Sequence, residues 1–171
     1  ICGEDGAVTE LLLASRGLQG CISSSLSELT SLSRLNLSYN LLSGGLPSEL
    51  ISTSSIVVLD VSFNRLDGEL HELNSSSPDR PLQVLNISSN LFTGAFPSTT
   101  WEKMSNLFAI NASNNSFTGY IPSTFCISSS SFAVLDLSYN QFSGNIPHGI
   151  GKCCSLRMLK AGHNNIIGTL P

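Results

Sequence analysis

One sequence motif recurs along the whole chain at a nearly fixed interval, and it constrains the fold more than any other feature. Clear copies run from Leu32 to Gly44, from Ile56 to Gly68 and from Leu82 to Gly94. Six asparagines within this motif are separated by 24, 26, 25, 25 and 24 residues, and they are Asn40, Asn64, Asn90, Asn115, Asn140 and Asn164. A period of this size over 171 residues indicates stacked repeats, each of which buries its apolar side against the next.

Each repeat begins with a short strand. The alternation of Leu35, Asn36 and Leu37 places leucines on one side and the polar residue on the other. Such a strand cannot bury its apolar side alone, so we expect successive copies to form a continuous parallel sheet. The recurrent asparagine carries donors and an acceptor. We therefore expect it to satisfy backbone groups that would each cost about 1–3 kcal/mol if left unpaired. The alternative is that these asparagines only form turns.

The second half of each repeat contains a glycine and a proline, as in Gly144-Asn-Ile-Pro147. Glycine permits a tight turn and proline discourages a long helix. We therefore expect short helical turns on the outer side, for example over residues 98–107 around Trp101, and an exposed loop at residues 74–81. The predicted fold class is α/β, a solenoid with a parallel sheet on its concave face and short helical turns on its convex side.

Composition and spacing argue against several classes of function. A net charge of −4 with only eight Lys and Arg argues against a nucleic-acid binder. No histidine or cysteine spacing typical of a metal site occurs. Asp60 and Asp136 would lie about 14 Å apart across three strand spacings, whereas paired glycosidase carboxylates need roughly 5–9.5 Å. We therefore expect no enzyme activity, no cofactor and no metal in this chain.

The repeats resemble plant-type leucine-rich repeats, whose pattern is LxxLxxLxLSxNxLxGxIP, over essentially the whole chain. Residues 135–144 and 159–168, together with Cys153, resemble more closely the ectodomains of receptor kinases that sense tyrosine-sulfated peptides, the phytosulfokine and sulfated-glycopeptide receptors. The resemblance implies one domain over residues 1–171 with about seven repeats. It also implies that residues 1–7 are the tail of an N-terminal cap and that both ends are cut from a longer protein.

The function implied by this resemblance is peptide sensing on the extracellular side of the plasma membrane. The signal would pass to a serine/threonine kinase outside this chain, and the partners would be a peptide ligand, a co-receptor or both. Two alternatives remain open. One is a secreted inhibitor resembling polygalacturonase-inhibiting proteins, which bind microbial wall-degrading enzymes, and the other is a receptor-like protein without a kinase.

Five cysteines suit an oxidising compartment. Cys2 resembles the last cysteine of the family's cap, with a partner before residue 1. The resemblance favours a disulfide between Cys126 and Cys153, and Cys154 is an alternative partner. Cys21 has no obvious mate.

Glycosylation sequons point to the same compartment. They occur at Asn36, Asn74, Asn86, Asn111 and Asn114. Asn74 lies in the expected loop and is the strongest candidate, whereas sugars on Asn36, Asn86 and Asn111 would project from the strand face and cover part of it.

The open face of the predicted sheet is the candidate binding surface. The alternation of side chains along each strand places a mildly apolar stripe there, made of Val58, Val84, Ala109, Val134 and Met158. An aromatic row lies beside it, made of Tyr39, Phe63, Tyr139 and His163. Exposed aromatic side chains are good anchors for an extended peptide. The other candidate residues are Arg34, Asp60, Asp136 and Lys160. The alternative is that these positions only tolerate side chains that fit a strand surface.

A sulfated tyrosine would need Arg or Lys side chains, because charge-assisted bonds to an anion are strong. On or near the open face these are Arg34, Arg157 and Lys160, and they are dispersed. We therefore expect the contact with a sulfate group to lie elsewhere in the full receptor.

Overall fold

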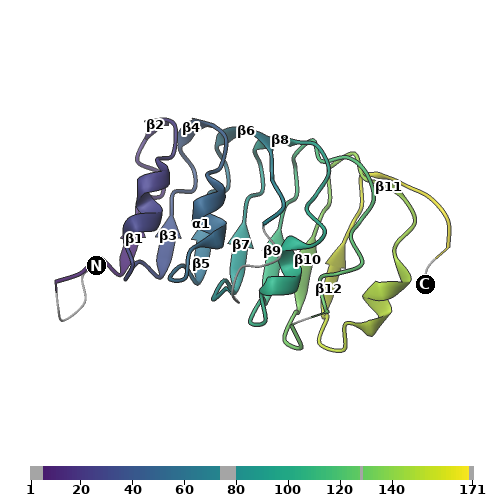
Figure 1. Cartoon of the computed structure of the whole chain (residues 1–171). Helices are drawn as coiled ribbons and strands as arrows, with labels where there is room; N and C mark the ends of the chain where they lie inside the picture. Colours follow the sequence, from purple (N-terminus) through teal and green to yellow (C-terminus); the bar gives the residue numbers. More distant parts are fainter. Residues whose placement is uncertain (1–5, 74–79, 128, 170–171) are drawn as a thin grey trace.

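The computed structural model describes residues 6–73, 80–127 and 129–169. In this part of the chain, seven parallel strands form one sheet in the order β1-β3-β5-β7-β9-β10-β12 (Figure 1). Their bounds are β1 (Glu10–Leu12), β3 (Arg34–Asn36), β5 (Val58–Asp60), β7 (Val84–Asn86), β9 (Ala109–Asn111), β10 (Val134–Asp136) and β12 (Met158–Lys160). Equivalent positions of neighbouring strands are in register, as Leu35 with Leu59 and Leu59 with Leu85. The predicted stacking is confirmed.

A second set of parallel strands runs along the same axis, and the sequence did not predict it. Its strands are β2 (Gln19–Gly20), β4 (Leu41–Gly44), β6 (Arg65–Glu69) and β8 (Leu91–Thr93), followed by the pair β11 (Ser143–Gly144) and β13 (Asn165–Ile166). Isolated bridges from Ala95 to Thr118 and from Tyr120 to Ser143 continue the line between the two groups. Each repeat is therefore tied to its neighbours by backbone hydrogen bonds along two lines.

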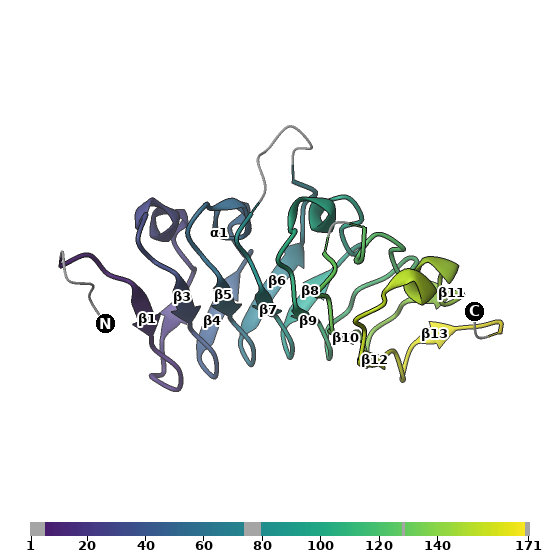
Figure 2. The same ribbon diagram turned by 90° about the horizontal axis from the view of Figure 1, so that it is seen from below.

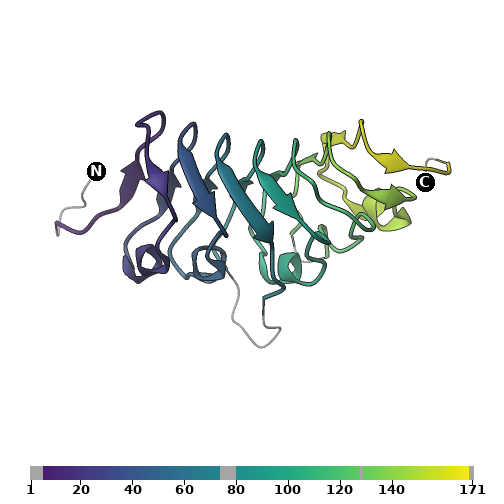
Figure 3. The ribbon, with the colours of Figure 1, turned by 90° about the horizontal axis from the view of Figure 1, so that it is seen from above.

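Short helical turns lie in a line along one side of the stacked repeats, away from the seven-stranded sheet (Figures 2 and 3). They are η1 (Ser24–Glu28), α1 (Ser48–Ser52), η2 (Thr100–Lys103) and η3 (His148–Lys152). The helical turn expected around Trp101 is present but shorter than residues 98–107. Most of the expected loop, residues 74–79, lies outside the described residues. The fold is thus the predicted solenoid, with its parallel sheet on the concave face and helical turns on the convex side.

The core is formed by the inward side of the sheet and changes character along the chain. The middle residues of the inner strands, such as Leu59 and Leu135, are fully buried. Phe92, Phe117 and Phe142 occupy equivalent positions of successive repeats, and their rings lie 6.0 and 6.3 Å apart. Leucine side chains dominate the earlier repeats, and aromatic rings fill the later ones.

The recurrent asparagines connect neighbouring repeats, as Asn90 illustrates. Its side-chain oxygen accepts the Leu66 N–H at 3.0 Å, and its side-chain nitrogen donates to the carbonyls of Val61, Ile87 and Ser88 at 3.0–3.2 Å. Equivalent bonds are made by Asn40, Asn64, Asn115, Asn140 and Asn164. Because each asparagine binds backbone groups of the preceding repeat, the predicted backbone-satisfying role is confirmed.

The glycine of the repeat has a second role besides permitting the turn. Gly144 has a φ of +75°, and the ring of Tyr120, from the preceding repeat, lies 2.5 Å from the point where a Cβ would stand. A side chain at position 144 would therefore be strained by its backbone and would also displace this ring.

A carboxylate joins two repeats on the convex side. Glu72 accepts hydrogen bonds from both the backbone N–H groups and the hydroxyls of Ser98, Thr99 and Thr100, at the start of η2. Burial acts to raise the pKa of Glu72, but the hydrogen bonds from Ser98 and Thr99 outweigh it and lower the pKa from 4.5 to about 2.

The first prediction concerns Asn90. Replacing this buried side chain by alanine leaves backbone groups of two repeats unpaired, so Asn90→Ala should lower the free energy of unfolding by about 2–4 kcal/mol in denaturant titrations. Asn164→Ala is the matched control, because Asn164 makes the same bonds but is half-buried in the last described repeat, where water can replace them. If both variants lost the same free energy of unfolding, the buried position of Asn90 between two repeats would not be what makes it stabilising.

The second prediction concerns pH. A depressed carboxyl pKa contributes stability that is fully present above the unfolded value of 4.5 and is lost as the pH falls through about 2. The thermal midpoint of the wild type should therefore fall more steeply than that of Glu72→Gln between these two pH values. Glu49→Gln serves as control, since Glu49 is exposed and accepts a side-chain bond of 3.5 Å from Ser48. Parallel curves for wild type and Glu72→Gln would refute this role.

Candidate binding face

The open face of the seven-stranded sheet carries three rows of side chains that follow the solenoid axis. The first, the apolar row, comes from the first residue of successive strands and consists of Val58, Val84, Ala109, Val134 and Met158. These residues are paired in register, so they lie side by side. Met158 is 43% exposed and the others are half-buried. The predicted apolar stripe is present as a continuous row.

The second row, the Asn/Asp row, stands at the last residue of the strands and has a structural role that sequence reasoning missed. It consists of Asn36, Asp60, Asn86, Asn111 and Asp136. In each case one side-chain oxygen accepts the N–H of the residue two positions later and the hydroxyl of the same serine. At Asp60 these bonds from Ser62 measure 2.9 and 2.6 Å. The fivefold recurrence of (Asn/Asp)-x-Ser was the signal that could have revealed it.

The charged candidates on this face all have side-chain partners. Arg34 lies 3.6 Å from Glu10, and Lys160 lies 3.4 Å from Asp136. Asp136 lies in register with Asn111 and Lys160 on this face but is only 8% exposed, and Ser138 and Lys160 bind its carboxylate. Asp60 is half-buried and accepts a bond of 3.3 Å from the Asn86 amide. The sheet therefore offers few unpaired charges to a ligand.

The third row, the left-handed row, lies where each repeat turns out of the sheet. Its members have φ between 53° and 56° and are Ser15, Tyr39, Phe63, Ser89, Asn114, Tyr139 and His163. This conformation costs roughly 1–2 kcal/mol in an ordinary residue. Backbone bonds to the next repeat maintain it, such as the 2.9 Å bond from the Tyr39 N–H to the Ser62 carbonyl. The side chain at each position is consequently free to vary and to face solvent.

The four aromatic candidates of the expected row form two separate stacked pairs. Tyr39 and Phe63 stack with ring centroids 4.2 Å apart, and Tyr139 and His163 stack at 4.1 Å. Ser89 and Asn114 interrupt the row, and their side chains share a hydrogen bond of 3.2 Å. All four rings belong to exposed residues. The face thus carries two exposed aromatic anchors with a polar section between them.

One further exposed aromatic residue was not among the candidates. Phe108 directly precedes β9, at the opposite strand end from the left-handed row, and is 46% exposed. Strand alternation predicts an inward side chain here, but the strand begins only at Ala109, so the alternation does not apply.

The structure describes three of the four residues in the predicted cysteine pairings and four of the five sequon asparagines. The Cys126–Cys153 disulfide is present, as favoured by the resemblance, and Cys21 and Cys154 are free and exposed. Cys2 and the sequon residue Asn74 lie outside the described residues. Asn114 is exposed, whereas Asn36, Asn86 and Asn111 are half-buried in the Asn/Asp row. Sugars on all five sequons remain predictions.

The described residues contain no cluster of three or more His, Cys, Asp or Glu side chains arranged to hold a metal ion. No helix among them has the length and apolar character that crossing a bilayer requires.

Parallel strands stacked through an asparagine in six successive turns define the class of leucine-rich-repeat solenoids. Comparison with protein families agrees, because the leucine-rich-repeat model matches residues 31–52, 81–102, 106–127 and 131–153, more than half of the chain. The chain belongs to the leucine-rich-repeat family. No curated protein sequence matches it significantly.

Solved structures of plant receptors share this architecture. Pollen receptor kinase 3 is 28% identical with a TM-score of 0.85, and the match covers 99% of this chain and 80% of that one. The Arabidopsis receptor kinase HAESA, in complex with the peptide hormone IDA and the co-receptor SERK1, is 31% identical with a TM-score of 0.80 over 90% of this chain. PEPR1 bound to AtPEP1 is 32% identical with a TM-score of 0.70 over 96%. The chain spans about a quarter of the HAESA and PEPR1 chains.

The third prediction tests the Asn/Asp row. Asp60→Asn keeps an oxygen acceptor for the Ser62 N–H and hydroxyl, so the free energy of unfolding should change by less than about 0.5 kcal/mol, whereas Asp60→Ala should lower it by about 1–2 kcal/mol. Denaturant unfolding of both variants measures the difference. If asparagine destabilised the chain as much as alanine, charge and not the shared acceptor would be the property that matters at this row.

Proposed function

We propose that this chain is a peptide-recognition segment of the extracellular part of a plant leucine-rich-repeat receptor-like serine/threonine kinase. In this proposal the chain itself is non-catalytic, and a kinase outside it transmits the signal. The observation that carries the proposal is the open face, on which an apolar row lies beside two solvent-exposed aromatic pairs, one pair toward each end of the row. The similarity to ectodomains solved with peptide hormones and a co-receptor supports it.

The dimensions of the face suit an extended peptide lying along the solenoid axis. Seven strands at about 4.8 Å give a length of about 29 Å, which an extended chain covers with about nine residues at 3.3 Å each. The apolar row would receive alternate apolar side chains of such a peptide. The pairs Tyr39–Phe63 and Tyr139–His163 would hold its two ends, since aromatic residues supply much of the energy of peptide and protein interfaces.

The resemblance to receptors for tyrosine-sulfated peptides belongs to the same proposal, with a restriction that the charges suggest. Arg34 and Lys160 already face Glu10 and Asp136, so neither cation is free to neutralise a sulfate without breaking an ion pair. A sulfate group would accordingly be bound in repeats outside this chain. The disulfide and the sequons support an extracellular location, because both are typical of oxidising, secretory compartments.

The fourth prediction locates binding. Peptides selected from a phage-displayed random library on the wild-type chain should bind Val84→Arg at least about tenfold more weakly, because the substitution places a bulky charge in the middle of the apolar row. The matched control is Leu91→Arg, the same kind of change at an exposed position of β8 in the other sheet.

Thermal unfolding of both variants establishes that they fold, and interferometry gives the dissociation constants. Peptides that bind Val84→Arg as well as the wild type, or that lose affinity only for Leu91→Arg, would reject the open face as the binding surface.

A further inference from the structure

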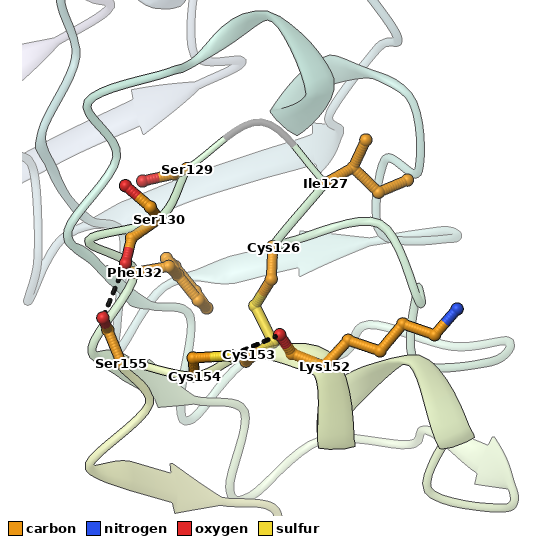
Figure 4. A pocket seen from close by; sticks show the side chains of 9 residues that line it. All are labelled: Cys126, Ile127, Ser129, Ser130, Phe132, Lys152, Cys153, Cys154 and Ser155. Carbon is orange, nitrogen blue, oxygen red and sulfur yellow. Dashed lines mark hydrogen bonds between the residues drawn. A yellow bond between two sulfur atoms is a disulfide. The ribbon is translucent and has the colours of Figure 1, made fainter.

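Three sulfur atoms gather in a hollow of about 250 Å³ beside η3, away from the candidate binding face (Figure 4). Cys126 and Cys153 form the disulfide there, and Cys154 is a free, exposed cysteine. All three line the same hollow, together with Phe132 and Lys152. A nucleophilic group and a bond that it can attack therefore share one solvent-accessible site.

The backbone at Cys153 brings the neighbouring sulfur back toward the disulfide. Cys153 has φ −77° and ψ 77°, the geometry of an inverse γ-turn, and the Cys154 N–H donates to the Lys152 carbonyl at 3.0 Å. The Cys154 thiol donates to the same carbonyl at 3.5 Å. In an extended chain, adjacent side chains point to opposite sides. Here the turn holds the Cys154 sulfur against the peptide unit that precedes Cys153.

We propose that these cysteines form a disulfide-exchange site in which Cys126 alternates between two partners. The thiolate of Cys154 attacks the sulfur of Cys126, a Cys126–Cys154 bond forms, and the Cys126–Cys153 bond breaks. Cys153 leaves as a thiolate and takes up a proton equivalent to the one that Cys154 released. One disulfide and one thiol are present before and after the step, so no external oxidant or reductant is needed.

The segments that would have to move in this exchange lie outside the strands and helices. Cys126 and Cys154 both lie in turns, outside the strands and helices, so no pairing of the sheets has to break. The Cα atoms of Cys126 and Cys153 are 5.3 Å apart, within the range of about 4.4–6.8 Å that disulfides span. Moving the partner by one residue shifts its Cα by about 3.8 Å, which a turn can absorb by rotating its backbone.

Exchange would change how the last described repeat is tied to the one before it. The disulfide joins the segment after Phe125 to the end of η3, and β12 follows only a few residues later. Transfer to Cys154 moves the attachment point one residue closer to β12. It also exposes Cys153 as the thiol that can react with a further disulfide.

Alkylation mapping tests the proposal. The chain is equilibrated at about pH 8.5, where thiolates form, and then quenched with iodoacetamide, which blocks every free thiol and stops exchange. Trypsin releases residues 153–157 between Lys152 and Arg157, still joined to the peptide that holds Cys126. Fragmentation of this peptide shows which of its two cysteines is alkylated. We expect alkylation at Cys154 in most molecules and at Cys153 in at least about 1%, as for a minor state a few kcal/mol higher.

Two variants test whether the Cys154 sulfur can bond Cys126 at all, separately from how the wild type is distributed between the two disulfides. Cys153→Ser should form the Cys126–Cys154 disulfide, and Cys154→Ser, the control, should keep Cys126–Cys153 and show no alkylation in residues 153–157. Wild-type protein alkylated at Cys154 alone after equilibration would overturn the proposal, even if a variant failed to fold. Free Cys126 and Cys154 in a folded Cys153→Ser protein would overturn it as well.

Discussion

The asparagine in each turn is the interaction on which the rest of the structure depends. Strands of three residues cannot hold a sheet together by their own ladder bonds, and the turn that follows each strand leaves backbone groups facing inward. Asn40 and its equivalents bind these groups in their own repeat and in the repeat before, as the bonds from Asn64 to the Leu37 and Val61 carbonyls show. Their spacing in sequence therefore sets the register of the whole solenoid.

Fixing the register in this way leaves other positions free, and the candidate binding face is made of them. The Asn/Asp row is constrained by its serine partners, but the left-handed row accepts Tyr, Phe, Ser, Asn or His with the same backbone. The apolar row is constrained only by its place on a strand. Recognition can thus change from repeat to repeat while the frame stays constant, which is the property that a peptide-sensing surface needs.

Much of this architecture could be predicted from the sequence, because periodicity reports the stacking directly. The parallel sheet, the role of Asn90 and the Cys126–Cys153 disulfide were all anticipated, the last through family resemblance. What escaped prediction depends on neighbours that are distant in the chain. Asp136 is buried because Lys160 of the next strand covers it, and Glu72 finds its donors 26 to 28 residues later.

Other features escaped prediction because they lie at or beyond the ends of the inner strands. Alternation assigns a side to a residue only inside a strand, so it assigns none to the exposed Phe108, one position before β9. The second sheet, β2-β4-β6-β8, escaped because its strands are short and each buries at most one side chain, such as Phe92 in β8, which is too little alternation to identify a strand. The pairing of Tyr39 with Phe63 required the spacing of adjacent repeats, which only the folded chain provides.

Side-chain amide hydrogen exchange, followed by NMR, tests the central role of the asparagines most directly. The Nδ2 protons of Asn90 and Asn140, which donate to carbonyls in the buried interior, should exchange with solvent far more slowly than those of exposed Asn145 in the same sample. Protection that matches that of the surrounding backbone amides would agree with repeats joined through these side chains. Exchange of Asn90 and Asn140 as fast as that of Asn145 would contradict it.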